Sequence, residues 1–167
     1  MRRTVTMNAA IAVTATAIDA EAFAPFGDLI VQPPNGQRSD WTNALANSRS
    51  KARISLETSG VKRIDLPATL AVMERHAHSF QTFIPLDVSR YLICVAPNGS
   101  DDLPAIAGLR AFIIGAGAGI TYRANVWHHP IAALDRDGQF AILMWRSGGD
   151  DDEEFVDLNH PVNVRSP

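Results

Sequence analysis

Short apolar runs recur along the chain and are separated by glycine, proline and asparagine. The run at 90–96 is the most strongly apolar, and residues 54–58 alternate cleanly between apolar and polar positions. A two-residue period places successive side chains on opposite faces of a strand. Short strands at a spacing of roughly ten residues, with almost no helix, are typical of an all-β barrel or jelly roll.

Each predicted strand consists of an apolar or alternating run of residues, and residues that disfavour strands stand at its ends. The segment 70–76 is assigned to a strand, although its length alone would also allow a helix. Asp19 precedes residues 20–23 and is expected to cap a single short helical turn. The strands are expected at 11–17, 28–31, 54–58, 61–66, 70–76, 81–86, 90–96, 110–114, 120–122, 131–134 and 140–145.

The C-terminal third of the chain contains a turn signal and an acidic tail. Residues 131–134 and 140–145 flank the turn-forming residues 135–138, and this arrangement predicts a β-hairpin. The acidic stretch that begins after Gly148 predicts a solvated loop. The chain has no internal repeat and no domain linker, so residues 1–167 are expected to form a single domain.

Composition narrows the classes of protein that remain. The chain of 167 residues is 46% hydrophobic and 20% charged, which is ordinary for a globular protein with a buried core. Its net charge of −3 argues against a general nucleic-acid binder. No apolar run approaches the roughly 20 residues of a membrane-spanning helix. The basic start at Met1 resembles a secretory signal, but Asn8 and Thr14 interrupt its apolar core, so a first strand is favoured.

The single cysteine, Cys94, lies inside the apolar run 90–96. One cysteine cannot form an internal disulfide, which fits a reducing compartment and predicts a cytoplasmic location. A small buried apolar side chain is the favoured interpretation of Cys94, since a nucleophile would need a nearby base.

Four of the five histidines lie in two polar segments, 74–81 and 122–130. His76 and His78 are two residues apart, so on a strand both imidazoles would share a face. Three imidazoles and one oxygen donor form a plausible site for a divalent transition metal. The predicted ligands are His76, His78, Gln81 and His128, and the alternative for each histidine is a hydrogen-bonded structural residue.

This arrangement resembles the cupins, metal-binding barrels that carry His-x-His and an acidic residue on one strand and a third histidine on a later one. Gln81 stands near the place of the acid. His128 and His129 would point to opposite faces of a strand, and His128 is the expected ligand because it resembles the histidine that follows a tight turn in cupins. His129 is then left to support the ligands or to make a dimer contact. Asn125, where cupins commonly have glycine, tolerates a positive φ.

Two charged residues beside these segments are candidates for chemistry. Glu74 would share a face with His76, as a general base or as a surface carboxylate. Arg146 follows the predicted strand 140–145 and could bind a carboxylate with two parallel hydrogen bonds, or lie on the solvated surface.

Both segments also resemble the ureidoglycolate lyase family. Residues 74–86 look like its E-R-H-x4-Q-x-F-I-P segment, and residues 122–131 look like its Y-x-x-[GN]-x-W-H-H-P-L segment. Supporting matches at 22–28 and 109–112 extend the resemblance over nearly the full chain. The chain departs from the family at His78, which replaces an apolar residue.

The resemblance implies a cupin-like jelly-roll barrel, commonly a homodimer, that cleaves (S)-ureidoglycolate to glyoxylate and urea in allantoin and purine-nitrogen breakdown. It implies a divalent metal, with nickel the one cited, a small-molecule substrate, and no nucleic-acid or membrane partner. The alternatives are a metal-dependent cupin acting on another small hydroxy or keto acid, and a non-catalytic barrel that binds a small acid. The expected catalytic residues are Glu74, Tyr122 and His129, and the expected substrate-binding residues are Arg75, Trp127 and Arg146.

Overall fold

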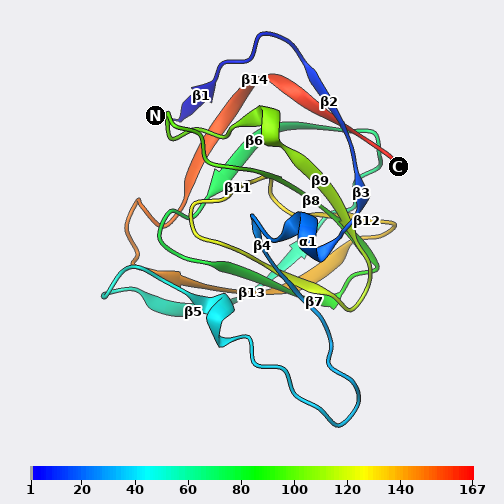
Figure 1. Cartoon of the computed structure of the whole chain (residues 1–167), viewed down its shortest axis with the longest axis vertical. Helices are drawn as coiled ribbons and strands as arrows, with labels where there is room; N and C mark the ends of the chain where they lie inside the picture. The colour runs from blue at the N-terminus through cyan, green and yellow to red at the C-terminus, as the bar shows by residue number, and fades with distance from the viewer. Residues whose placement is uncertain (1) are drawn as a thin grey trace.

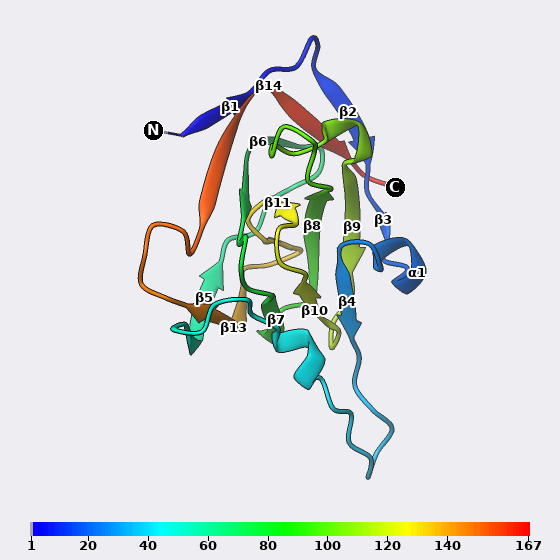
Figure 2. The ribbon, with the colours of Figure 1, turned by 60° about the vertical axis from the view of Figure 1, so that its left-hand side comes forward.

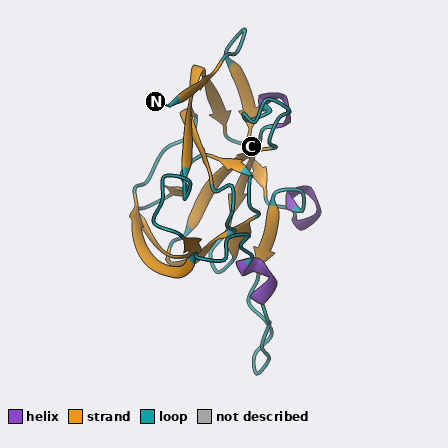
Figure 3. Ribbon diagram, turned by 90° about the vertical axis from the view of Figure 1, so that its left-hand side faces the viewer, coloured by secondary structure: helices purple, strands orange, loops and turns teal. Residues whose placement is uncertain are grey.

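The computed structural model describes residues 2–167, which form two β-sheets with three single-turn helices (Figures 1 and 3). The nine-stranded sheet contains β1 (Arg3–Val5), β2 (Ile11–Thr14), β3 (Thr16–Ala17), β6 (Ala68–Arg75), β8 (Arg90–Ala96), β9 (Arg110–Ile114), β11 (Trp127–His128), β12 (Ala132–Leu134) and β14 (Glu154–Arg165). The five-stranded sheet contains β4 (Gly27–Ile30), β5 (Arg53–Val61), β7 (Gln81–Asp87), β10 (Gly119–Tyr122) and β13 (Gly138–Arg146). The helical turns are α1 (Ala20–Phe23), η1 (Thr42–Leu45) and η2 (Ile106–Gly108).

The strand order explains how the barrel closes. The larger sheet runs β1-β14-β6-β11-β8-β9-β3, and the smaller runs β4-β10-β7-β13-β5. β2 also pairs with β14, while β3 pairs with β9, so residues 11–17 join the two sides of the larger sheet (Figure 2). Within the described chain, these pairings produce the expected all-β, cupin-like jelly-roll fold.

Alternation along β8 divides the apolar side chains between two cores. Tyr91, Ile93 and Val95 belong to a core that also contains Phe83 and Phe140 of the smaller sheet. Their sequence neighbours belong to a second core, on the opposite face of β8, with residues of β6, β9 and β14; from β8 these are Leu92, Cys94 and Ala96. Cys94 is buried, as expected, and burial raises the pKa of its thiol to about 12.

Several local predictions are confirmed. The strands at 90–96 and 110–114 have the expected bounds, and 70–76 corresponds to strand β6. The Asp19 carboxylate accepts a hydrogen bond from the Ala22 backbone N–H at 2.8 Å and caps α1. Among residues 2–167, none of the helices has the length and apolar character needed to cross a membrane.

The predicted hairpin is wrong. β12 pairs with β8 in the larger sheet, whereas β13 pairs with β5 and β7 in the smaller sheet. The intervening turn therefore carries the chain from one sheet to the other. The nine residues of β13 pair along their whole length with the nine of β5, a match that the three-residue β12 cannot offer.

The predicted solvated tail is also wrong, because it contains the twelve-residue strand β14. Val156, Val162 and Val164 are fully buried, so the alternating apolar pattern outweighs the acidic residues that precede it. The break expected between the predicted strands 54–58 and 61–66 does not occur either, since Ser59 and Gly60 pair with β13 and continue β5 to Val61. The separate strand expected at 61–66 is therefore absent from the described structure.

Candidate metal centre and active site

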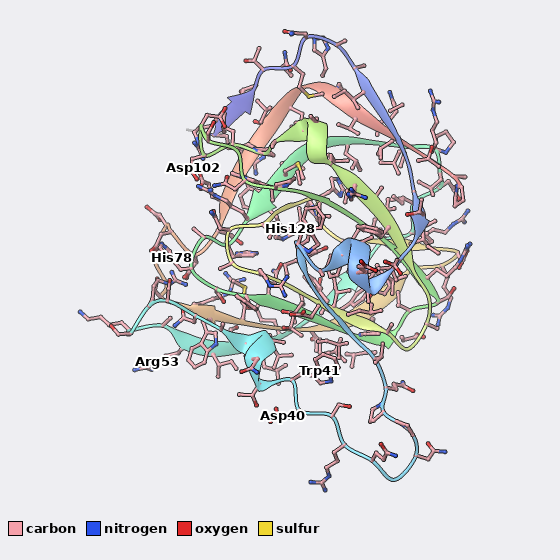
Figure 4. All side chains as sticks on the ribbon, viewed as in Figure 1. Asp40, Trp41, Arg53, His78, Asp102 and His128 are labelled. Atoms are coloured by element: carbon pink, nitrogen blue, oxygen red, sulfur yellow. The ribbon has the colours of Figure 1, made fainter. Side chains whose placement is uncertain are left out.

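The two distant histidines, His76 and His128, meet inside the barrel. Their ring centroids are 5.5 Å apart, and their side chains are almost completely buried. His128 lies on β11, between β6 and β8, and it is labelled within the ring of strands in Figure 4. The turn before it contains Asn125 at φ 69°, and the Asn125 backbone N–H donates to the His76 carbonyl at 2.9 Å. The positive φ at Asn125 is as expected.

Backbone carbonyls fix the protonation of both rings. His76 Nδ1 lies 2.8 Å from the Asp152 carbonyl oxygen, and His128 Nδ1 lies 3.0 Å from that of Val126. A carbonyl oxygen only accepts hydrogen bonds, so each Nδ1 carries the proton and donates it. In the neutral ring each Nε2 then presents a lone pair, and both Nε2 atoms are buried without a hydrogen-bond partner among the described residues.

Glu74 completes a cluster of three potential ligands. One ligand atom from each of Glu74, His76 and His128 lies within 4.8 Å of the others. The Glu74 Oε1 and His128 Nε2 atoms are 3.4 Å apart. Two acceptor atoms that face each other need a positive charge between them, either a proton or a metal ion. Imidazole nitrogens oriented through Nδ1–H bonds to carbonyls, beside a carboxylate, fit a divalent transition metal.

The electrostatics of the cluster favour the ligand forms of these groups. Burial, with a smaller contribution from the neighbouring His128, lowers the pKa of His76 to about 4, so the His76 imidazole is neutral near pH 7. Burial acts to raise the pKa of Glu74, but the neighbouring His128 outweighs it and the net pKa is lowered. Glu74 is therefore ionised. A neutral imidazole and an ionised carboxylate are the forms that bind metal ions.

Two further buried polar side chains, Tyr122 and Gln81, lie in this region. Tyr122 stacks on His128 with ring centroids 4.2 Å apart, and its Cα lies opposite that of Gln81 on β7. The Tyr122 hydroxyl and Gln81 Oε1 are buried, and neither has a hydrogen-bond partner in the described part of the chain. Burial raises the pKa of Tyr122 well above 10, so its hydroxyl stays protonated.

Comparison with known proteins identifies the family. The family model for ureidoglycolate lyase matches residues 10–165. The chain belongs to the ureidoglycolate lyase family. It is 33% identical over 159 residues to a ureidoglycolate lyase of Brucella anthropi, covering 88% of this chain and 92% of that protein. It is 40% identical over 133 residues to one from Burkholderia cepacia, covering 74% and 73%.

Among solved structures, similarity extends to a dTDP sugar isomerase of Desulfovibrio desulfuricans. The two chains share 17% sequence identity and a TM-score of 0.48, over 77% of this chain and 80% of the isomerase. The family assignment therefore rests on the sequence relatives. The description of the site rests on the geometry of this chain.

In this family member His78 lies outside the cluster, which corrects its placement on the face of His76. β6 ends at Arg75, so the alternation of a strand no longer holds between His76 and His78. The His78 side chain is 42% exposed, its Nδ1 is 3.2 Å from Ser48 Oγ, and Figure 4 shows it near the edge of the barrel.

Arg75 and Trp127 face away from the cluster, although both belong to motifs of the ureidoglycolate lyase family. The Arg75 guanidinium donates to carboxylates of Asp102 and Glu154 and stacks 4.6 Å above the Trp127 ring. The Trp127 Nε1–H donates to Asn98 Oδ1 at 2.8 Å. Because alternate side chains on β6 and β11 point to opposite faces, the structure does not bring these two residues to His76 and His128.

Arg146 and His129 border the site. Arg146 Nε donates to Glu57 Oε1 at 2.9 Å, its side chain is one-third exposed, and its charge contributes to the lowered pKa of His76. His129 Nδ1 donates to the Pro130 carbonyl at 2.6 Å, and burial lowers the pKa of its imidazole. His129 is thus a neutral base near pH 7.

Asp152 and Arg49 contribute to the site and were missed by sequence reasoning. The backbone carbonyl of Asp152 orients His76, and the Arg49 guanidinium binds the Asp152 carboxylate at 2.7 Å. A run of acidic residues resembles a solvated surface, so composition gave no sign that one of them is buried.

Proposed function

We propose that the chain is a ureidoglycolate lyase that cleaves (S)-ureidoglycolate to glyoxylate and urea in the breakdown of allantoin and purine nitrogen. The observation that carries this proposal is the pair of buried Nε2 lone pairs beside an ionised carboxylate, in a member of the family. A carbon–nitrogen lyase needs a place where a small hydroxy acid is held and its hydroxyl made acidic.

The proposed metal ligands are Glu74, His76 and His128, with the Gln81 amide oxygen as a fourth. A bound divalent ion, nickel by family resemblance, would polarise the substrate oxygens and lower the pKa of its hydroxyl. The donor set agrees with this proposal, since imidazole suits Ni, Zn, Fe and Cu. His78 is not included, because its ring lies outside the cluster and is partly exposed.

The reaction requires one proton to leave the substrate hydroxyl and one to reach the departing nitrogen. Loss of the hydroxyl proton lets the oxygen form the glyoxylate carbonyl as the carbon–nitrogen bond breaks. The electron pair of that bond leaves with nitrogen, which takes up a proton and becomes urea. No water is consumed, so the step is an elimination.

Residues of the chain supply these proton transfers in the proposed mechanism. His129 is neutral and is not a proposed metal ligand, so it can accept the hydroxyl proton; Glu74 is ionised and could accept it through the carboxylate oxygen that does not bind the metal. The Tyr122 hydroxyl keeps its proton near pH 7 and is buried beside His128, so it is the proposed donor to nitrogen. General acid–base assistance of this kind contributes about 10²–10⁴-fold.

Arg146 is the proposed ligand of the substrate carboxylate. Its Nε is bonded to Glu57, which holds the guanidinium plane at the end of β13 while part of it remains exposed. Planar guanidinium groups bind carboxylates through parallel hydrogen bonds. Arg75 and Trp127 cannot share this role without leaving their present contacts, so their contribution to substrate binding would be indirect. We also propose a homodimer and a cytoplasmic location.

The test is turnover by protein stripped with EDTA and reloaded separately with Ni, Mn or Zn. Incubation with racemic ureidoglycolate should consume one enantiomer and release equimolar glyoxylate and urea. Release of ammonia would instead indicate an amidohydrolase, and oxygen consumption with Fe(II) on another acid would indicate a different cupin reaction. Saturable binding of glyoxylate without turnover by any metal form would replace the lyase with a binding protein.

A further inference from the structure

The Asp152 carboxylate is buried in the turn between β13 and β14. It accepts hydrogen bonds from the Ser147 and Gly148 backbone N–H groups, both at 2.7 Å, and its residue is 6% exposed. Burial acts to raise the pKa of this carboxyl, but these hydrogen bonds and the one from Arg49 outweigh it and lower the pKa to about 2. Asp152 is thus a fixed anion at the centre of the turn.

Arg49 connects this turn to a distant part of the chain. Its Nη1 lies 2.7 Å from Asp152 Oδ1 and 3.0 Å from Ser147 Oγ, and its Nη2 donates to the Trp145 carbonyl at 3.1 Å. The Arg49 side chain is 14% exposed, so these contacts are shielded from water. Charge-assisted hydrogen bonds in a shielded setting hold backbone positions firmly.

The anchored residue also supplies the backbone oxygen that binds His76 Nδ1–H at 2.8 Å. The remaining His76 nitrogen, Nε2, is buried and has no hydrogen-bond partner within residues 2–167. A shift of the Asp152 carbonyl would therefore release the ring to rotate or to change tautomer. The Asp152 carboxylate makes its hydrogen bonds within the turn and to Arg49, while the backbone oxygen of the same residue orients the His76 ring.

We propose that Asp152 and Arg49 are positioning residues, which hold the Asp152 carbonyl so that His76 presents the Nε2 lone pair to a divalent metal. This inference rests on the proposed metal-dependent function. It adds two residues that lie outside the histidine segments 74–81 and 122–130. A role in stability alone would change the unfolding midpoint without changing the tautomer of His76 or the geometry of a bound metal.

The experiment uses the full chain and readouts that need no ureidoglycolate. Nitrogen-15 NMR of the five histidines, with His76→Gln for assignment, reports which nitrogen of His76 carries the proton. Titration with Co²⁺, followed by its visible absorption, reports affinity and coordination geometry. The variants are Asp152→Ala and Arg49→Gln, with Arg49→Lys as the conservative partner and Asp150→Asn as the matched control, because Asp150 is exposed in the same turn.

Asp152→Ala keeps the backbone carbonyl but removes its anchor, so we expect a mixture of His76 tautomers and Co²⁺ binding weakened about 10–100-fold. Arg49→Gln should show a smaller change in the same direction, Arg49→Lys should recover part of it, and Asp150→Asn should match the parent. If Asp152→Ala does not fold, Arg49→Gln decides the question. An unchanged tautomer and an affinity within twofold in the folded variants would overturn the proposal, whether or not the parent protein cleaves ureidoglycolate.

Discussion

Arg75 and His76 are neighbours in sequence and almost equally buried, at 4% and 3% exposure, but their polar atoms have opposite fates. The Arg75 guanidinium donates to Asp102, Glu154 and two asparagine side chains. The His76 ring donates once, through Nδ1, and its Nε2 finds no partner among the described residues. The Arg75 guanidinium is therefore fully hydrogen-bonded, whereas the His76 ring keeps one acceptor, Nε2, without a partner among the described residues.

The difference separates stability from chemistry. A buried acceptor without a partner costs free energy, so native proteins have few of them, and one beside a carboxylate and a second imidazole fits a site that binds a ligand. A saturated arginine has no donor left to offer a ligand, and its contacts hold β6 against β14 and the loop that contains Asp102. We therefore assign Arg75 to the stability of the fold and propose a functional role for His76, and four experiments test this assignment.

The largest expected effect comes from His128→Ala. Removal of one of two imidazole ligands should abolish metal-dependent turnover, a loss of at least about 1,000-fold if the metal supplies several kcal/mol. Metal content after dialysis and steady-state kinetics provide the measurement. Circular dichroism should show a folded protein, and a fully active His128→Ala variant would remove the cluster from the mechanism.

Arg75→Met should mainly affect stability. It removes the nearly buried guanidinium that bonds Asp102 and Glu154, whose own carboxylates are partly exposed, so the free energy of unfolding should fall by more than in a variant that loses one exposed ion pair. Urea denaturation of the apo protein measures the loss. Arg146→Met is the matched control, since its ion pair is partly exposed and should contribute less than about 1 kcal/mol. Equal losses in the two variants would contradict the structural assignment of Arg75.

Tyr122→Phe removes the hydroxyl but keeps the ring that stacks on His128. If this hydroxyl delivers the proton to nitrogen, kcat should fall about 100-fold, at the lower end of general acid catalysis. KM and Co²⁺ affinity should change little, because the ring remains in place. An unchanged kcat would show that another group donates the proton.

The pH dependence of stability should reveal His76. The pKa of His76 is about 4 in the folded protein and about 6.5 in the unfolded chain, so below pH 6.5 the unfolded state binds a proton that the native state does not. The contribution of His76 is fully present above pH 6.5 and is lost as the pH falls toward 4. At about 1.4 kcal/mol per unit, the difference between 6.5 and 4 corresponds to roughly 3–4 kcal/mol in full. Thermal unfolding of the apo protein should show this acid loss, and His76→Gln should reduce it.

Particular residues show how far the sequence could predict the site. The closeness of His76 and His128 could be predicted because their segments combine imidazoles with strand patterns and a family motif, and their role as ligands stays a prediction. His78 was misplaced because strand alternation was extended beyond Arg75, where β6 ends. Asp152 was missed because its burial depends on Arg49, about a hundred residues away, and on the backbone of its own turn.

Local sequence patterns predict most of the short strands, the capped turn at Asp19 and the family, because alternation, capping and motifs are local properties of the chain. Only long-range contacts determine that β13 pairs with β5 and β7, that the acidic tail leads into a buried strand, and that every donor of Arg75 is hydrogen-bonded. They also determine that His76 and His128 each keep a lone pair free among the described residues. The physical reason is that strand pairing and hydrogen-bond satisfaction depend on partners far along the chain, which local patterns do not specify.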